Sequence, residues 1–421
     1  MDEAGCPRKV ENGDDMGGRQ RSLVAVGVVA VLALTACTGG AEAARDPQAS
    51  SAPPTTVPQP VAATVPLELA ITPAKGTKDL PISTEIGLKL AGGTVKTVTL
   101  RDAKGGSIPG TLREDGSAWV PAKPLKHRQR YAATVTAADP GGATTTATTT
   151  FTTMAEPARR TGTGLYLFDD HTYGVAMPVV AEFNPGIKKK DRAAVQKRMF
   201  VQTDPPQPGA WSWTSSGTQA YYRAPQFWQP GTQLKVRLAV GGLPTGGGRY
   251  GSQDRAATAK IGRNFVMKVE NKTKKMTVLQ DGKVVRTVLV SLGKPSTPSS
   301  SGTMVVMDKQ TSTVFDTTDT DGANGYKMTI DYAQRLTWSG QYVHSASWSV
   351  GAQGHRNVSH GCVNVSPSNA RWLFDHTLIG DPITVRGTGD KLIQGNGWTA
   401  WDLSWENFIK GSALPVPANL R

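Results

Sequence analysis

The chain has 421 residues, of which 38% are hydrophobic and 19% charged, and its formal net charge is +14. This length allows about two to four domains, and the 46 glycines and 28 prolines favour loops, turns and strands over long helices. The positive charge suits a surface of anionic polymers or phospholipid headgroups. The sequence contains no stripe of basic and aromatic residues that would indicate nucleic-acid binding. We therefore expect no nucleic-acid partner.

The N-terminal segment is typical of an exported protein. Two arginines precede an apolar run, 23–34, that is too short to span a bilayer comfortably as a permanent helix. The tetrapeptide 34–37, Leu-Thr-Ala-Cys, resembles a bacterial lipobox, in which the cysteine is acylated; an ordinary signal with a coincidental cysteine is the alternative. The acidic stretch before Met16 makes that residue a candidate start. We therefore expect a signal peptide at 1–37 and a lipoprotein anchored through Cys37 to the outer face of the cytoplasmic membrane.

Three regions of different composition follow the signal. Residues 38–64, rich in alanine, proline and threonine, predict an extended linker. Residues 65–153 contain short runs of alternating hydrophobicity separated by turn residues, which predict an immunoglobulin-like β-sandwich domain. Residues 154–258 contain similar runs and predict a second β-domain. Neither contains a catalytic constellation, so both are expected to be spacers or binding modules. The expected elements are strands at 67–71, 95–100, 131–135, 144–153, 174–180, 198–201, 209–213, 219–223 and 233–238, and a short helix at 188–195.

A third domain is expected at 259–387, followed by a tryptophan-rich extension at 388–421. Its Asp281-Gly282 dipeptide predicts a hairpin turn. The other expected elements are strands at 265–270, 276–279, 284–292 and 383–385, a single helical turn at 331–335 and a helix at 366–374. The aromatic residues of the extension are expected to form a packed apolar flap rather than a ligand site; they are Trp398, Trp401, Trp405 and Phe408.

Cys362 is the candidate nucleophile. It lies in the hexapeptide 359–364, Ser-His-Gly-Cys-Val-Asn, and 14 residues separate this motif from His344. A thiolate is the reactive form of cysteine, and an imidazolium beside it would lower the thiol pKa. If the motif is extended, His360, Cys362 and Asn364 share one face. Backbone N–H groups within the motif could then bind an oxyanion. Two histidines flank the thiol, so the residues alone do not name the base.

Two other interpretations of these residues remain. A zinc site could use three histidines and the thiolate, although the spacing matches no paired metal-binding motif. Its ligands would be His344, His355, His360 and Cys362. The cysteine could instead be a buried, inert residue. The glycine and histidines around it argue against a position in an apolar core.

The motif from His344 to Asn364 resembles the signature of the L,D-transpeptidases, whose catalytic domain is also called YkuD. The run 343–355, Val-His-Ser-Ala-Ser-Trp-Ser-Val-Gly-Ala-Gln-Gly-His, is similar to the mycobacterial and actinobacterial branch of the family. A lipobox, two immunoglobulin-like domains and a tryptophan-rich tail are the layout expected there. The resemblance is residue-specific over about 285–387. It implies a mainly β protein with a β-rich catalytic domain that contains one short helix.

The resemblance also implies a reaction. Cys362 would attack the carbonyl of meso-diaminopimelate in a tetrapeptide stem of peptidoglycan, release the terminal D-Ala and form a thioester. The side-chain amine of diaminopimelate on a second stem would then make a 3→3 cross-link. No cofactor or metal is implied, and carbapenems are expected to acylate the same thiol.

Roles for individual residues are carried over by position. His344 would be the base, the Ser345 carbonyl would orient it, and His360 and Gly361 would line the oxyanion site with Cys362. The implied substrate-binding residues are Tyr326, Ser339, Trp348, Ser359 and Asn364.

The chain departs from the family pattern between 304 and 325, which contains no tyrosine and several aspartates. This departure affects lid contacts and acceptor or drug selectivity rather than the reaction. An L,D-carboxypeptidase or a transferase that anchors proteins to diaminopimelate could use the same site. A different class, a wall-binding β-module with an inactive catalytic domain, is the remaining alternative.

Overall fold

The computed structural model of the chain describes residues 65–316, 318 and 327–421. This part is mainly β, with 46% of residues in strands and 9% in helices, and it confirms the expected fold class. Residues 65–421 belong to one compact unit. Within the described residues, every helix is too short or too polar to cross a bilayer. The expected signal peptide, Cys37, Met16 and the linker lie outside the described residues.

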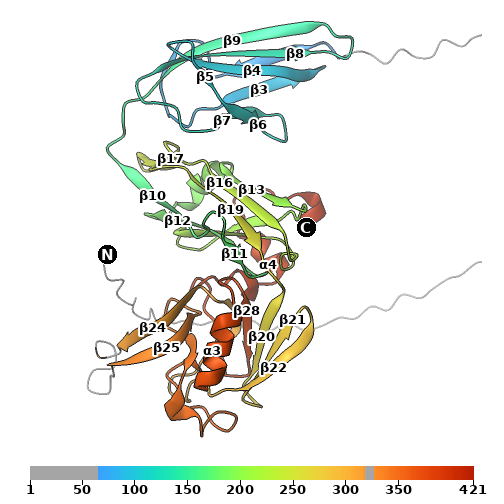
Figure 1. Ribbon diagram of the computed structural model, residues 1–421. Coiled ribbons are helices and arrows are strands. Elements are labelled where there is room, and N and C mark those ends of the chain that lie inside the picture. Colours follow the sequence, from blue (N-terminus) through green and yellow to red (C-terminus); the bar gives the residue numbers. More distant parts are fainter. Residues whose placement is uncertain (1–64, 317, 319–326) are drawn as a thin grey trace, which may run out of the picture. The chain divides into compact units, whose positions relative to one another are not determined.

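Residues 65–153 fold into two antiparallel-rich sheets, drawn in blue to green in Figure 1. The first sheet has the order β1 (Glu68–Thr72), β3 (Ile86–Ala91), β7 (Ala118–Pro121), β6 (Gly110–Leu112). The second has the order β2 (Thr77–Leu80), β9 (Thr144–Thr153), β8 (Arg130–Ala138), β4 (Thr94–Asp102), β5 (Ser107–Ile108). Alternate residues of β8 are buried, as the sequence predicts for a half-buried strand. Tyr131 and Phe151 form a stacked cross-strand pair in the core, with ring centroids 5.7 Å apart.

Two further sheets follow. One has the order β14 (Ala210–Trp213), β15 (Gln219–Arg223), β12 (Val179–Asn184), β10 (Arg160–Leu165), β18 (Arg249–Gly251), β17 (Pro244–Gly246). The other has the order β11 (Thr172–Tyr173), β19 (Arg255–Ile261), β16 (Gln233–Leu238), β13 (Met199–Asp204). The expected helix at 188–195 is present as η1 (Lys189–Asp191) and α1 (Arg192–Gln196). Strand β19 runs three residues beyond the expected boundary at 258.

The expected strand at 174–180 is wrong over most of its length, because only its last two residues belong to β12. The preceding backbone makes hydrogen bonds outside any ladder. Gly174 N–H donates to Ile379 O at 2.8 Å, and Ala176 N–H donates to Gly380 O at 3.0 Å. This segment is apolar because it is buried against residues 379–380. A buried apolar segment has a sequence like that of a buried strand, even where no strand forms.

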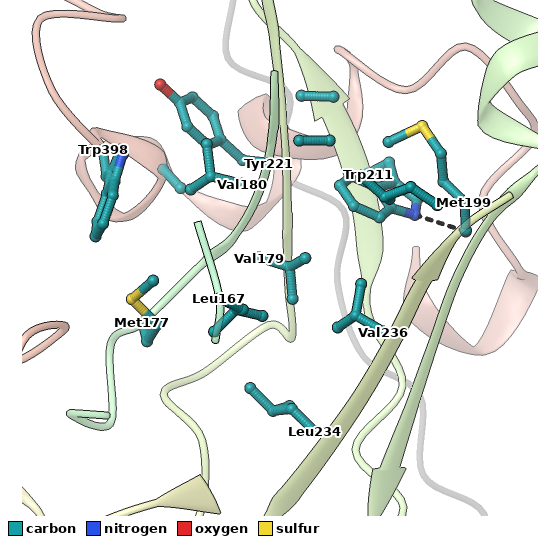
Figure 2. Packing of buried hydrophobic residues seen from close by; sticks show 14 of the residues in the cluster. Leu167, Met177, Val179, Val180, Met199, Trp211, Tyr221, Leu234, Val236 and Trp398 are labelled. Atoms are coloured by element: carbon teal, nitrogen blue, oxygen red, sulfur yellow. Dashed lines mark hydrogen bonds between the residues drawn. The ribbon is translucent and has the colours of Figure 1, made fainter. Parts of the chain in front are cut away.

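A large apolar core lies between the two sheets of the second region (Figure 2). Trp211 fills part of it and donates its indole N–H to Met199 O at 3.1 Å. The same cluster contains Trp398 and Phe408 from the C-terminal extension. The extension also contains β29 (Asp390–Lys391), η4 (Ala400–Asp402), α4 (Trp405–Ile409) and η5 (Ala418–Leu420). It is therefore the packed apolar flap that the sequence predicts.

The third region contains two sheets and helix α3 (Pro367–His376). The six-stranded sheet has the order β22 (Lys283–Leu289), β21 (Lys275–Gln280), β20 (Phe265–Glu270), β28 (Pro382–Arg386), β23 (Ser300–Val305), β29. The four-stranded sheet has the order β24 (Asp308–Asp316), β25 (Lys327–Arg335), β26 (Tyr342–Ser345), β27 (Val363–Val365). The helical turn expected at 331–335 is wrong, because these residues belong to β25 and all except Tyr332 pair with β24. Long-range pairing overrides the helix-compatible composition of this segment.

Helix α3 supports the four-stranded sheet. The Ser366 side chain accepts a hydrogen bond from Asn369 N–H, and Pro367 occupies the first helical turn. The helix buries Ala370 and Leu373 in the apolar cluster that also contains Val343 of β26. This packing fixes the strand that leads into the candidate site.

Candidate active site

Two parallel strands bring the histidine and cysteine motifs together. In the register of β26 and β27, His344 lies opposite Asn364, and Cys362 comes directly before β27. Because side chains alternate along a strand, His344 and Asn364 lie on one face of the sheet. The neighbouring valines, Val343, Val363 and Val365, point to the other face and pack in the core. Residues separated by a long loop thus become neighbours at one edge of the sheet.

Cys362 is buried, with 8% of its surface exposed, and is a free thiol. Its Sγ lies 3.7 Å from Gly340 O, which is an acceptor for the thiol proton. Burial raises the pKa of Cys362 to about 12, while a hydrogen bond from the Tyr342 backbone N–H acts in the opposite direction. The resting thiol is therefore protonated at neutral pH.

His344 is 3% exposed and is held by a backbone hydrogen bond. Its Nδ1 lies 2.8 Å from Ser345 O. A carbonyl only accepts, so Nδ1 carries the proton and Nε2 has the free lone pair that a base requires. Burial lowers the pKa of the imidazole, and contacts with Ser345 O and the Asn364 side chain offset part of this shift. Trp348 stacks against the ring with centroids 6.0 Å apart.

Burial acts against a thiolate–imidazolium pair in this resting geometry. Burial raises the pKa of Cys362 and lowers the pKa of His344, so both shifts favour the neutral forms. Within the described residues, the hydrogen bond of Sγ goes to Gly340 O rather than to the imidazole. The thiol proton is therefore directed to Gly340 O in the described structure.

The loop before Cys362 is bent, so the extended form considered for the motif does not apply to residues 360–362. Gly361 has φ +117°, a conformation that residues with a Cβ rarely adopt. This bend leaves His360 exposed while Cys362 is buried, so the two side chains do not share a face. Gly361 N–H donates to Ser359 Oγ at 3.2 Å, which in turn donates to Cys362 O at 2.7 Å. The Gly361 N–H is thus engaged within the loop, whereas the Tyr342 backbone N–H acts on the sulfur by lowering the pKa of Cys362 against the effect of burial.

His360 interacts with a lysine outside the motif. Lys294 Nζ lies 3.0 Å from His360 Nε2. An ammonium group only donates, so this nitrogen accepts and its lone pair is occupied. Across residues 65–316, 318 and 327–421, no group of three or more His, Cys, Asp or Glu side chains could hold a metal ion. The four residues of the zinc hypothesis are not assembled, because His344 is buried while His355 and His360 are exposed.

The zinc hypothesis gives a direct test. We expect a chelator such as EDTA to leave the acylation rate of Cys362 unchanged, because His360 Nε2 is already bonded to Lys294. The measurement is the rate of covalent modification of the protein before and after dialysis against the chelator. A loss of rate that added zinc restores would contradict this expectation.

The other residues assigned by resemblance occupy different environments. Ser359 and Asn364 are buried, and Trp348 is 55% exposed. Ser339 is exposed, and its backbone N–H and Oγ both bond to Asn396 of the extension, each at 2.9 Å. The extension therefore holds the turn that carries Gly340. Tyr326 lies outside the described residues.

Sequence reasoning missed several groups around the thiol and the imidazole. They are Lys294, Gly340, Tyr342, Ser349, Gln353 and Asn396. Alternation with His344 places the Tyr342 side chain on the same face as the base, but Tyr342 acts on the thiol through its backbone N–H, which this pattern does not indicate. The others act through backbone atoms or through long-range hydrogen bonds that leave no pattern in the sequence.

Comparisons with known proteins agree with this architecture. The model of a bacterial Ig domain matches residues 77–244, and that of the L,D-transpeptidase catalytic domain matches 264–385. Among curated proteins, L,D-transpeptidase 2 of Mycobacterium tuberculosis is 34% identical over 80% of this chain and 82% of its own length. L,D-transpeptidase 5 of the same species is 30% identical over 95% and 86%. A solved L,D-transpeptidase in complex with imipenem is 34% identical, covers 55% of this chain and 100% of its own, and has a TM-score of 0.46.

Proposed function

Because the chain belongs to the L,D-transpeptidase family, we propose that it forms 3→3 cross-links in peptidoglycan through a thioester at Cys362. The observation that carries this proposal is the register of β26 and β27, which places a buried, Nδ1-protonated His344 beside the cysteine motif. Its free Nε2 is the group that can take the thiol proton. The donor would be a tetrapeptide stem and the acceptor a diaminopimelate amine.

The described residues support the following steps. His344 Nε2 takes the proton of Cys362 as Sγ bonds to the carbonyl carbon of diaminopimelate, and the Tyr342 N–H donates to the developing negative charge. The tetrahedral intermediate collapses when the C–N bond to D-Ala breaks, and the imidazolium gives its proton to the leaving amine. The acceptor amine then attacks the thioester, loses its proton to His344, and the proton returns to the departing thiolate. The burial of the thiol limits hydrolysis of the thioester.

We also propose that the protein acts on the outer face of the cytoplasmic membrane. The support comes from the sequence: a lipobox-like tetrapeptide ends in Cys37, and a proline-rich stretch of about 27 residues follows. At roughly 3 Å per residue, this linker would reach some 80 Å into the wall. Metabolic labelling with a palmitate analogue tests the anchor, and loss of label in Cys37→Ala is the expected result.

Incubation with a disaccharide-tetrapeptide tests the cross-linking activity. We expect a dimer that has lost one D-Ala, detected by mass spectrometry, because the thioester is resolved by a second stem. Tripeptide alone would indicate an L,D-carboxypeptidase, and an unchanged substrate would indicate a binding module. Transfer of a protein to diaminopimelate in place of the dimer would indicate an anchoring transferase.

Imipenem provides a second, independent test of the nucleophile. We expect the intact protein to gain one molecule of imipenem covalently, with the adduct on the peptide that contains Cys362. Mass spectrometry of the intact and digested protein gives both results. An adduct on any other residue would contradict the assignment of the nucleophile.

A further inference from the structure

We propose that Ser349 and Gln353 form a buried positioning network that fixes the carboxamide of Asn364, with Oδ1 directed towards His344. The network rests on the proposed function, because its purpose is to support the proton transfer between His344 and Cys362. It changes the role of Asn364 from a substrate contact to a group that acts on the base.

The network joins the segment that connects β26 and β27 to Asn364 of β27. Ser349 ends the short helix η3 (Ser347–Ser349), and Gln353 follows in the loop that connects β26 to β27. Ser349, Gln353 and Asn364 are each 2–3% exposed. Buried polar groups of this kind are costly unless they are paired, so their hydrogen bonds are constrained.

The geometry fixes the direction of each hydrogen bond, starting from a carbonyl. Ala346 O can only accept, so Ser349 Oγ, 3.1 Å away, donates its single proton there. Gln353 Nε2 is 3.2 Å from the same carbonyl and 3.2 Å from Ser349 Oγ, and it donates to both. Ser349 Oγ has no proton left to donate. Its contact with Asn364 at 3.2 Å must therefore be an acceptance from Nδ2.

This assignment determines where the Asn364 oxygen lies. With Nδ2 held by Ser349, Oδ1 occupies the other side of the carboxamide. Among the described residues, Oδ1 is buried and lacks a hydrogen-bond partner. His344 lies directly opposite Asn364 in the register of β26 and β27, so the two side chains are neighbours on one face. The unpaired oxygen is thus a negative end of a dipole that is available to stabilise the imidazolium.

The functional consequence concerns the charged state of the base. A neutral His344 is the resting form, and the imidazolium must appear while the tetrahedral intermediate exists. Asn364 Oδ1 is a fixed dipole that stabilises this charge in a site from which water is excluded. If the carboxamide were free to turn over, its amino group would face the ring and oppose protonation. Ser349 prevents this reversal, and Gln353 holds Ser349.

The first measurement follows His344 itself. In the Cys362→Ala background, the pKa of His344 can be read from its ring resonances by NMR, with His344→Ala identifying the signal. We expect Ser349→Ala to lower this pKa by about one unit and Gln353→Met by less. Ser347→Ala, an exposed serine in the same helix, is the matched control and should leave the pKa unchanged.

The second measurement is the rate of imipenem acylation with Cys362 intact. We expect Ser349→Ala to slow acylation about tenfold and Ser347→Ala to have no effect. In the double variant Ser349→Ala/Asn364→Ala, the rate should equal that of Asn364→Ala alone, because Ser349 acts only through Asn364. Thermal unfolding of each variant verifies that the protein remains folded, and Gln353→Met carries the test if Ser349→Ala does not fold.

Three outcomes would overturn the proposal: an unchanged His344 pKa in Ser349→Ala, additive rate losses in the double variant, or a loss of melting temperature as the only effect. These readouts need no stem peptide. A protein that passes them but leaves the tetrapeptide unchanged would refute the cross-linking function while the positioning network stands.

Discussion

Replacing Cys362 with alanine is expected to abolish both cross-linking and imipenem acylation. The thiol forms the covalent bond in every step of the proposed reaction, and the described part of the chain holds no second free cysteine. Removal of a catalytic nucleophile in comparable sites costs about a million-fold in rate. The measurement is dimer formation from the tetrapeptide, followed by mass spectrometry, together with the mass of the protein after exposure to imipenem.

A matched variant separates chemistry from structure. Cys362→Ser keeps the shape of the side chain and the acceptor at Gly340 O, but a hydroxyl is a far weaker nucleophile at this site. We expect it to be nearly as inactive as the alanine variant and to unfold at the same temperature as the parent. An imipenem adduct that persists in Cys362→Ala would place the nucleophile elsewhere.

Replacing Arg223 with alanine is expected to cost about 3–5 kcal/mol of unfolding free energy and to release the C-terminal extension. Arg223 is 2% exposed, and its guanidinium donates to Ala400 O at 3.1 Å and to Leu403 O at 2.8 Å. It also lies over the rings of Trp401 and Phe408, at 4.5 and 4.4 Å from their centroids. Without it, buried carbonyls lose their donors and the aromatic rings face a cavity.

Burial lowers the pKa of Arg223 to about 10, so the group is still charged at neutral pH and its contacts persist. Denaturant unfolding measures the loss, and limited proteolysis detects release of the extension. Arg223→Lys keeps the charge but not the planar fork, so we expect an intermediate loss. Arg160→Ala is the control, because its ion pair with Glu156 is exposed and should contribute less than about 1 kcal/mol. Equal stability of Arg223→Ala and Arg160→Ala would contradict the prediction.

Regular strands were predictable from the sequence because alternation and burial coincide in them. Strand β20 is found at the residues that its alternating pattern predicts, and Asp281-Gly282 forms the expected turn between β21 and β22. The residues at 331–335 have no such pattern, and their strand exists because β24 pairs with them. The apolar run that begins at Gly174 looks like a strand because the contact with 379–380 requires burial.

In the candidate site, too, some features were predictable from the sequence and others were set only by folding. The motif predicted Cys362 as the nucleophile and the family resemblance predicted His344 as its base, and the register of β26 and β27 brings their strands together. The bend at Gly361 did not follow, because a positive φ at glycine is permitted by the sequence but not required by it. The role of Ser349 could not be predicted either, since its partners are fixed only by folding.

The loop from β26 to β27 contains two parts with different constraints. Its inner part, which includes Ser349 and Gln353, is buried against the strands. Its outer part, with Trp348 and Gly351, is exposed. Trp348 stacks on the His344 ring, whereas Gly351 lies in open space, and strand pairing sets the position of the His344 backbone, so changes around Gly351 need not displace the base. Evolution can therefore change the exposed part of this loop while the geometry of the buried base is inherited unchanged.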